Sequence, residues 1–310
     1  MSSDDRSSPA RTLHALGFDG VPLREPLLYP GRLVEGPTLL SDGQLFELGV
    51  ADDRIGGWPV QPHGDRRLPV PCAQGARGDP KSGSAVTLDA LLDGLGLPRA
   101  DDRYPVLSVG SNAAPGQLCH KLASRGLSDT VPMVPVRVRG IAVALSAHIS
   151  AAGYVSASPV LTPDAETPLV ATWLDREQLA AVDETEASYR RAFLPGEEFP
   201  MELPSGRRLG GAYLYCHARG VLGAPGGTGP RTPDGDQSAV LAGLLADSPR
   251  LRELLGPAPA DWVRRIRDDA SLRARGTELF EAEGWLLEEP GFAPYTGGPG
   301  DEITYRDLDS

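Results

Sequence analysis

The chain has 310 residues, of which 40% are hydrophobic, enough for two domains or for one domain with substantial extensions. Its formal net charge of -12 opposes binding to nucleic acid and to anionic membranes, and no local run of lysine or arginine offsets it. Because no apolar stretch reaches the roughly 18 residues that span a bilayer and the first residues do not resemble a secretory signal, we expect a cytoplasmic protein.

The three cysteines indicate neither a disulfide framework nor a metal centre. Cys72, Cys119 and Cys216 are odd in number and lie far apart in the sequence. His120 and His217 each follow a cysteine, but adjacent residues of a strand point to opposite faces and rarely share a metal. We therefore expect reduced thiols, no metal and no cofactor.

Residues 1–100 are predicted to form an N-terminal extension of strands and loops. The polar first dozen residues are typical of disorder. Further on, Asp42 and Gly43 between two apolar runs predict a β-hairpin, and the Gly-, Pro- and Arg-rich residues 56–84 predict an irregular loop. Leucines near helical spacing at 87–97 predict a helix that leads into the main domain.

The main domain is expected over residues 101–222. Alternating Val and Arg at 135–145 predict a half-exposed strand that becomes buried, and further strands are expected around 151–163 and at 169–174. A helix follows, because Asp175 is a suitable N-cap and a glutamine three residues later completes a capping box.

The segment VLSVGSNAAPGQL at 106–118 ends a strand abruptly. Gly110 tolerates a positive φ, and Asn112 tolerates it better than most residues. We therefore expect a turn at Gly110, Ser111 and Asn112 that exposes several backbone N–H groups, an arrangement that can hold an anion. The alternative is that these residues only end a strand. Ser111 lacks the G-x-S-x-G context of a serine nucleophile.

The predicted helix after residue 175 ends in a cluster of carboxylates. Asp183, Glu184 and Glu186 lie near the negative end of the helix dipole and repel one another. In one interpretation all three face water and pair with Arg190 and Arg191. In the other, one carboxylate lies beside apolar residues and serves as a general acid or base.

After a glycine-rich linker at 223–236, the chain is expected to form a C-terminal helical extension over 237–310. The linker lacks the Gly-Lys-Ser/Thr ending of a phosphate-binding loop. Apolar residues then recur near a spacing of 3.6, and four of them are expected to dock on the main domain: Trp262, Ile266, Leu279 and Phe280.

The order of these elements resembles the γ-glutamylcyclotransferase-like family. Hallmarks of that family are a Tyr-Gly-Ser-Asn loop after the first strand and a Leu-Asp-x-x-Glu-Gly segment followed by Tyr-x-Arg. VGSN at 109–112 stands in the first place, and VDETEA at 182–187 stands in the second, before Tyr-Arg-Arg at 189–191. Val109 replaces the usual tyrosine and Ala187 the usual glycine, so both motifs are partial.

The resemblance implies an α+β fold with a small mixed β-barrel flanked by helices. It implies a γ-glutamyl-amine cyclotransferase, a transferase or lyase that acts on a small-molecule γ-glutamyl substrate and needs no cofactor. In such a reaction the substrate's own α-amine attacks the γ-carbonyl and releases 5-oxoproline and a free amine or amino acid. Alternatives on the same scaffold are an amide hydrolase or acyltransferase, or a non-catalytic ligand-binding module.

By position in the family motifs, Glu186 is the expected general acid and base, with Glu184 as its competitor. Backbone N–H groups of Gly110, Ser111 and Asn112 would hold the substrate carboxylate or the developing oxyanion. The same resemblance assigns substrate contacts to two aromatic side chains, Tyr189 and Tyr215.

Overall fold

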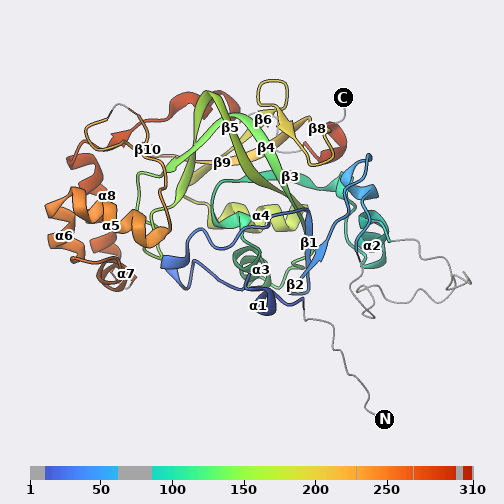
Figure 1. Ribbon diagram of the computed structural model, residues 1–310, viewed down its shortest axis with the longest axis horizontal. Helices are drawn as coiled ribbons and strands as arrows, with labels where there is room; N and C mark the ends of the chain where they lie inside the picture. The colour runs from blue at the N-terminus through green and yellow to red at the C-terminus, as the bar shows by residue number, and fades with distance from the viewer. Residues whose placement is uncertain (1–10, 62–85, 228, 268, 298–302, 309–310) are drawn as a thin grey trace, which may run out of the picture.

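The chain folds into an α+β structure built on one large, mostly antiparallel sheet (Figure 1). The computed structural model describes residues 11–61, 86–227, 229–267, 269–297 and 303–308. In the nine-stranded sheet β3 and β9 run parallel, and the other neighbours are antiparallel. Its strands are β1 (Thr38–Ser41), β2 (Gln44–Glu47), β3 (Tyr104–Ser108), β4 (Val131–Leu145), β5 (Ala157–Leu174), β6 (Tyr189–Pro195), β7 (Met201–Glu202), β8 (Arg208–Leu209) and β9 (Gly211–His217).

The predicted barrel is wrong, because the sheet is open. Its strand order is β2-β1-β4-β5-β3-β9-β6, and the two ends of that path do not pair with each other in the described part of the chain. The outer edge of β4 is occupied by β1, where Leu40 pairs with Val131, and by β7. At the other end of the sheet, Ala192 of β6 forms a bridge to Thr296 of the C-terminal segment. Closure by pairing of β4 with β6 is therefore blocked, because β4 already pairs with β1 and β7, and β6 contacts the C-terminal segment.

The N-terminal residues share this sheet. Asp42 and Gly43 both adopt a positive φ, 51° and 64°, which suits a two-residue turn, and the expected hairpin of β1 and β2 is confirmed. A helix, α2 (Leu88–Gly94), is also confirmed, and the side chain of Thr87 caps it. Most of the expected loop at 56–84, the first ten residues and Cys72 lie outside the described residues.

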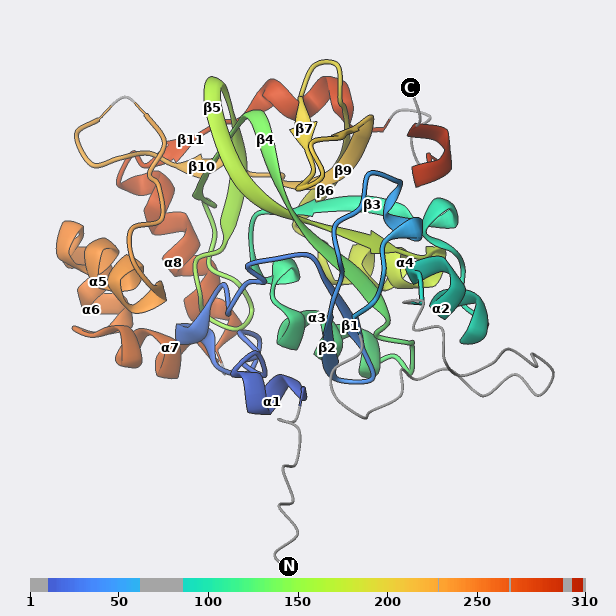
Figure 2. The ribbon, with the colours of Figure 1, turned by 45° about the vertical axis from the view of Figure 1, so that its right-hand side comes forward.

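Helices α3 (Pro115–Ala123) and α4 (Arg176–Thr185) cover one face of the sheet (Figure 2). The capping box of Asp175 and Gln178 is present and begins α4 as predicted. The guanidinium of Arg103 is fully buried and donates to Gln178 Oε1 at 3.2 Å and to the carbonyl of Trp173 at 3.2 Å. These contacts fix the start of the helix whose other end carries the acidic cluster.

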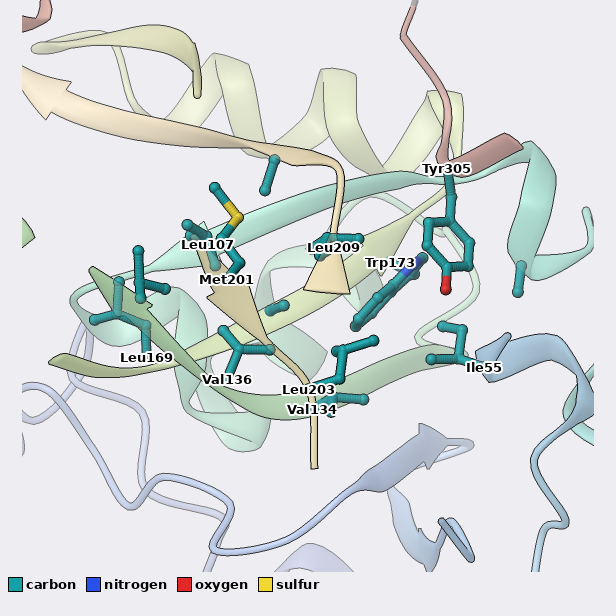
Figure 3. Close-up of a cluster of buried hydrophobic side chains, with 14 of the residues drawn as sticks. Ile55, Leu107, Val134, Val136, Leu169, Trp173, Met201, Leu203, Leu209 and Tyr305 are labelled. Carbon is teal, nitrogen blue, oxygen red and sulfur yellow. The ribbon is translucent and has the colours of Figure 1, made fainter. Parts of the chain in front are cut away.

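Alternate residues of the central strands supply two separate cores. Val106 and Val170 point toward α3 and α4, whereas Leu107 and Trp173 point to the opposite face. Figure 3 shows this second core, in which the edge of Trp173 meets the ring of Tyr305 with ring centroids 5.6 Å apart. The period of two thus places the sheet between α3 and α4 on one side and α2 with C-terminal and loop segments on the other.

The C-terminal helices gather at one end of the molecule, in orange to red in Figure 1. As expected, Trp262, Ile266 and Phe280 are buried, but they pack on the connection between β4 and β5, where Trp262 Nε1 donates to the carbonyl of Gly153 at 2.9 Å. None of the helices in the described ranges has the length and apolar content needed to span a membrane. The remaining elements are α1 (Leu13–Leu16), α5 (Gln237–Asp247), α6 (Pro249–Leu255), α7 (Pro259–Arg267), α8 (Ala270–Ala282), β10 (Val221–Leu222) and β11 (Leu286–Leu287).

Candidate functional site

A pocket of about 550 Å³ lies where several chain segments converge on one end of the sheet. Its wall is formed by the turn after β3, by α3, by the segment leading into β5 and by the C-terminal end of α4. The six residues expected in the site all line this pocket: Gly110, Ser111, Asn112, Glu186, Tyr189 and Tyr215.

The Glu186 carboxylate is held by two donors from elements that precede it in the chain. Its Oε1 accepts from Lys121 Nζ at 2.8 Å and from Asn112 Nδ2 at 3.0 Å. Lys121 Nζ also donates to Asn112 Oδ1 at 2.6 Å, which closes a ring of three side chains. The side chains of Lys121 and Glu186 are 9% and 15% exposed. A sheltered ion pair therefore forms part of the pocket wall, bridged by the amide of the turn.

Local structure places these three groups. Pro115 starts α3 directly after the turn, and Lys121 lies in its last turn, where a cation interacts favourably with the helix dipole. Gln117, one helical turn before Lys121, also lines the pocket and accepts from the backbone N–H of Leu23 at 3.0 Å. Glu186 is the C-cap of α4, and from this position its side chain reaches Lys121 of α3.

The three carboxylates of the acidic cluster have three different environments. Asp183 accepts from the hydroxyl of Tyr215 at 2.6 Å and forms an ion pair with Arg191. Glu184 is 69% exposed and pairs with Arg125. The solvent-facing interpretation therefore fits Glu184, and the pairing with Arg191 holds for Asp183, whereas Glu186 faces the pocket. Each charge near the end of the helix has its own cation, so the repulsion expected from the sequence is offset.

Gly110 is required for space. Its φ is -136°, so the expected use of a positive φ at this turn is wrong. A Cβ atom at Gly110 would lie 2.3 Å from the hydroxyl oxygen of Tyr29. Tyr29 cannot easily move away, because its ring stacks on Tyr154 with centroids 4.4 Å apart and its hydroxyl accepts from the backbone N–H of Ala157 at 2.7 Å. A tyrosine of the N-terminal segment thus closes the pocket wall beside the turn.

A chain of hydroxyl groups and imidazoles leads away from Tyr189. The Tyr189 hydroxyl is 2.6 Å from Ser156 Oγ, which is 2.9 Å from Ser146 Oγ. Ser146 Oγ is in turn 3.0 Å from His148 Nδ1, and the ring of His148 stacks on His217 at 4.0 Å between centroids. Tyr189 meets His217 edge to face. Ser156 and His148 both line the pocket, so this chain connects its wall to the core.

Burial sets the protonation state of these groups. It lowers the pKa of His148 to about 3 and that of His217 to about 4, so both rings are neutral near pH 7. Burial, together with the negative charge of Glu186, raises the pKa of the Tyr189 hydroxyl. Burial and the hydrogen bond to Asp183 raise the pKa of the Tyr215 hydroxyl. The two tyrosines therefore present protonated hydroxyl groups at the pocket.

The described cysteines lie outside the pocket wall. Cys119 and Cys216 are free thiols, as expected. Cys119 donates to Asp129 at 3.2 Å, and burial raises its pKa to about 12, so it stays protonated. In the part of the chain that the structure describes, no group of three or more His, Cys, Asp or Glu side chains is arranged to hold a metal ion.

Sequence reasoning missed Lys121 and Tyr29. For Tyr29 the sequence offers no signal, because its contacts are with residues 81 and 128 positions away. For Lys121 the sequence does offer a signal. Of the 30 lysines and arginines only two are lysines, Lys81 and Lys121, and of these two only Lys121 lies among the described residues. A chain that uses arginine at nearly every cationic position keeps a compact ammonium group here.

Comparison with known proteins yields distant structural similarities. No protein-family model and no curated protein matches the sequence. A solved gamma-glutamyl cyclotransferase is 13% identical over 64% of this chain and 94% of that chain, with a TM-score of 0.30. An uncharacterized protein from Homo sapiens is 13% identical over 65% of this chain and 95% of that chain, with a TM-score of 0.31.

A solution structure from Arabidopsis thaliana is also similar. It is 16% identical, with a TM-score of 0.28, over 37% of this chain, which spans only 61% of that protein's length. Identities and TM-scores at this level assign the chain to no family. What the pocket does has to be inferred from its own residues.

Proposed function

We propose that the pocket binds a γ-glutamyl amide and cyclises it, as in the γ-glutamylcyclotransferase-like family. One observation carries the proposal: Glu186 Oε1 accepts a hydrogen bond from Asn112, although the two residues belong to motifs 74 positions apart. The sheltered carboxylate thus faces the turn at the wall of a pocket of about 550 Å³. This volume suits a small molecule.

The reaction requires no group beyond the substrate and a proton carrier. A bond forms between the substrate's α-nitrogen and its γ-carbonyl carbon, and the bond from that carbon to the leaving nitrogen breaks. Of the three protons of the α-ammonium group, the lactam keeps one, one is carried to the leaving nitrogen, and the third ends on the freed amine or, when that amine is a weak base such as aniline, in solvent. Glu186 accepts a proton from the ammonium group and returns it to the leaving amine, which is general base and general acid catalysis in sequence.

The turn after β3 provides stabilisation of charge in this proposal. Ser111 and Asn112 begin the short helical turn η4 (Ser111–Ala113), whose first N–H groups have no acceptor within the turn itself. Donors of this kind at the pocket wall suit the oxyanion that develops on the γ-carbonyl. The protonated hydroxyls of Tyr189 and Tyr215 line the same pocket and are held by Ser156 and Asp183.

A substrate panel tests the proposal. The purified chain is incubated with γ-glutamyl amides and γ-glutamyl amino acids, and mass spectrometry scores 5-oxoproline against free glutamate. We expect 5-oxoproline. Free glutamate as the product would instead indicate an amide hydrolase, and transfer of the glutamyl group to an added amine would indicate an acyltransferase. No conversion of any compound would leave a non-catalytic binding module.

Two variants assign the carboxylate. Glu186→Gln should lower kcat by roughly 10²-fold or more, because the amide cannot carry a proton between the two nitrogens. Glu184→Gln is the matched control, since Glu184 is two residues away at the same helix end, is 69% exposed and pairs with Arg125. Circular dichroism and urea unfolding of both proteins monitor the fold. Inactivation by Glu184→Gln alone would overturn the assignment of Glu186.

A further inference from the structure

The ion pair in the pocket wall has two ends, and the proposed chemistry uses only one of them. Glu186 serves as the proton carrier, whereas Lys121 has no part in moving protons. Lys121 nevertheless is 9% exposed, and its ammonium group makes its two hydrogen bonds to Asn112 and Glu186, both of which line the pocket. Burying a cation is costly, and the cation needs a partner in every state of the site.

We infer that Lys121 recognises the α-carboxylate of the substrate, so that Lys121 and Glu186 together select a free α-amino-acid head group. The inference rests on the proposed function. A γ-glutamyl group carries an ammonium and a carboxylate on one carbon, about 3 Å apart by ordinary bond lengths. Lys121 Nζ and Glu186 Oε1 are 2.8 Å apart and carry the opposite arrangement of charges. The ammonium of the substrate then binds Glu186, and its carboxylate binds Lys121.

When the substrate binds in this way, Lys121 and Glu186 exchange each other for the substrate's charges, and no charge is left unpaired. Before binding, Lys121 and Glu186 neutralise each other. After binding, each neutralises one charge of the substrate, so the sheltered site gains ion pairs and strands none. A substrate with the amine but without the carboxylate would set two cations, its own ammonium and Lys121, on the single carboxylate of Glu186. Such a compound is expected to bind poorly even though its amine and amide are intact.

Asn112 keeps the two charged groups in place during the exchange. Its Oδ1 accepts from Lys121 and its Nδ2 donates to Glu186, so both side chains retain one fixed partner when the substrate separates them. The geometry therefore provides positioning for the two ends of the head group without requiring movement of α3 or α4.

Two substrates that differ in a single group test the inference. γ-Glutamyl anilide and 4-aminobutyryl anilide share the amine, the chain length and the leaving group, and both can close a five-membered lactam. Only the first carries the α-carboxylate. For the wild type we expect kcat/KM to be about 10- to 100-fold higher for the γ-glutamyl compound, the range given by one hydrogen bond between charged groups.

Lys121→Met removes the ammonium and keeps the length of the side chain. It should lower the ratio of kcat/KM for γ-glutamyl anilide to kcat/KM for 4-aminobutyryl anilide by a similar factor, to near one, because the loss of the ion pair with Glu186 affects both compounds whereas the loss of the carboxylate contact affects only the first. The matched control is Arg125→Met, because Arg125 follows the end of α3 and forms an ion pair with Glu184 of α4, which is 69% exposed, and neither residue lines the pocket. This variant should keep the wild-type preference.

Three results would overturn the inference: equal kcat/KM of the wild type for the two compounds, an equal loss for both in Lys121→Met, or loss of the preference in Arg125→Met. An equal loss would mean that Lys121 only positions Glu186. If the wild type forms no lactam from either compound, the proposed function fails. The dissociation constants of the two compounds, measured by calorimetry on wild type and Lys121→Met, then decide the role of Lys121. Binding of γ-glutamyl anilide that Lys121→Met does not weaken would overturn it.

Discussion

The stacked imidazoles of His148 and His217 should make the stability of the protein depend on pH. Burial, followed by the neighbouring ring and the charge of Arg219, lowers the pKa of His148 to about 3 from an ordinary 6.5. The unfolded chain therefore binds more protons than the folded chain between about pH 3 and 6.5, and the free energy of unfolding falls as the pH falls through this window. Integrated from pH 7 to pH 5, the loss is about 2 kcal/mol for His148.

Urea unfolding at pH 7 and pH 5 measures this loss. In His148→Gln, which keeps a polar partner for Ser146, the loss of unfolding free energy between the two pH values should be about 2 kcal/mol smaller than in the wild type. Equal losses in the wild type and His148→Gln would refute the assignment of a neutral, buried imidazole.

Three further changes test the packing around the site. Gly110→Ala should lower the free energy of unfolding by about 1 to 3 kcal/mol, because the new Cβ atom meets the Tyr29 hydroxyl. In urea unfolding, the double variant Gly110→Ala/Tyr29→Phe should lose less than the sum of the two single losses, and additive losses would contradict the contact. Arg103→Met, which leaves buried carbonyls without a donor, should cost at least about 2 kcal/mol by the same measurement, and an unchanged midpoint would contradict this role. Trp262→Ala removes a fully buried ring that donates to Gly153 and should cost about 3 to 5 kcal/mol in thermal or urea unfolding; a loss under about 1 kcal/mol would mean that the C-terminal helices are not anchored there.

Local features of the fold could be predicted, because their causes lie within a few residues. The capping box at Asp175 and the hairpin turn at Asp42 are examples. That the sheet stays open could not be predicted, since this depends on which distant segments pair with its outer strands. The expected break between two strands near Pro168 also failed, and β5 runs through it. In the described part of the chain β3 pairs with β5 only from Val170 onward, so at Pro168 the side of β5 that faces away from β4 has no strand partner, and a residue without an N–H group is tolerated there.

The candidate site likewise has residues that the sequence predicts and residues that it does not. The order of motifs was enough to predict that Glu186 and Asn112 would lie at one pocket, and they share a hydrogen bond. The partners that complete the pocket were out of reach. Lys121 is separated from Glu186 by 65 positions, and Tyr29 belongs to a segment that the sequence pattern marked only as an extension. Contacts of this kind depend on the packing of whole elements, which short-range patterns do not encode.

The pocket is assembled from three stretches of chain that lie far apart in the sequence. Leu23 and Tyr29 come from the N-terminal segment and Arg273 comes from α8, whereas the proposed acid–base residue and the turn belong to the central stretch. Randomising positions 23 and 273 would therefore change the shape of the pocket and keep the proposed acid–base residue and the turn. Selection on the two flanking segments, in nature or in a directed-evolution library, could therefore change which molecules the pocket accepts without changing Glu186 or the turn after β3.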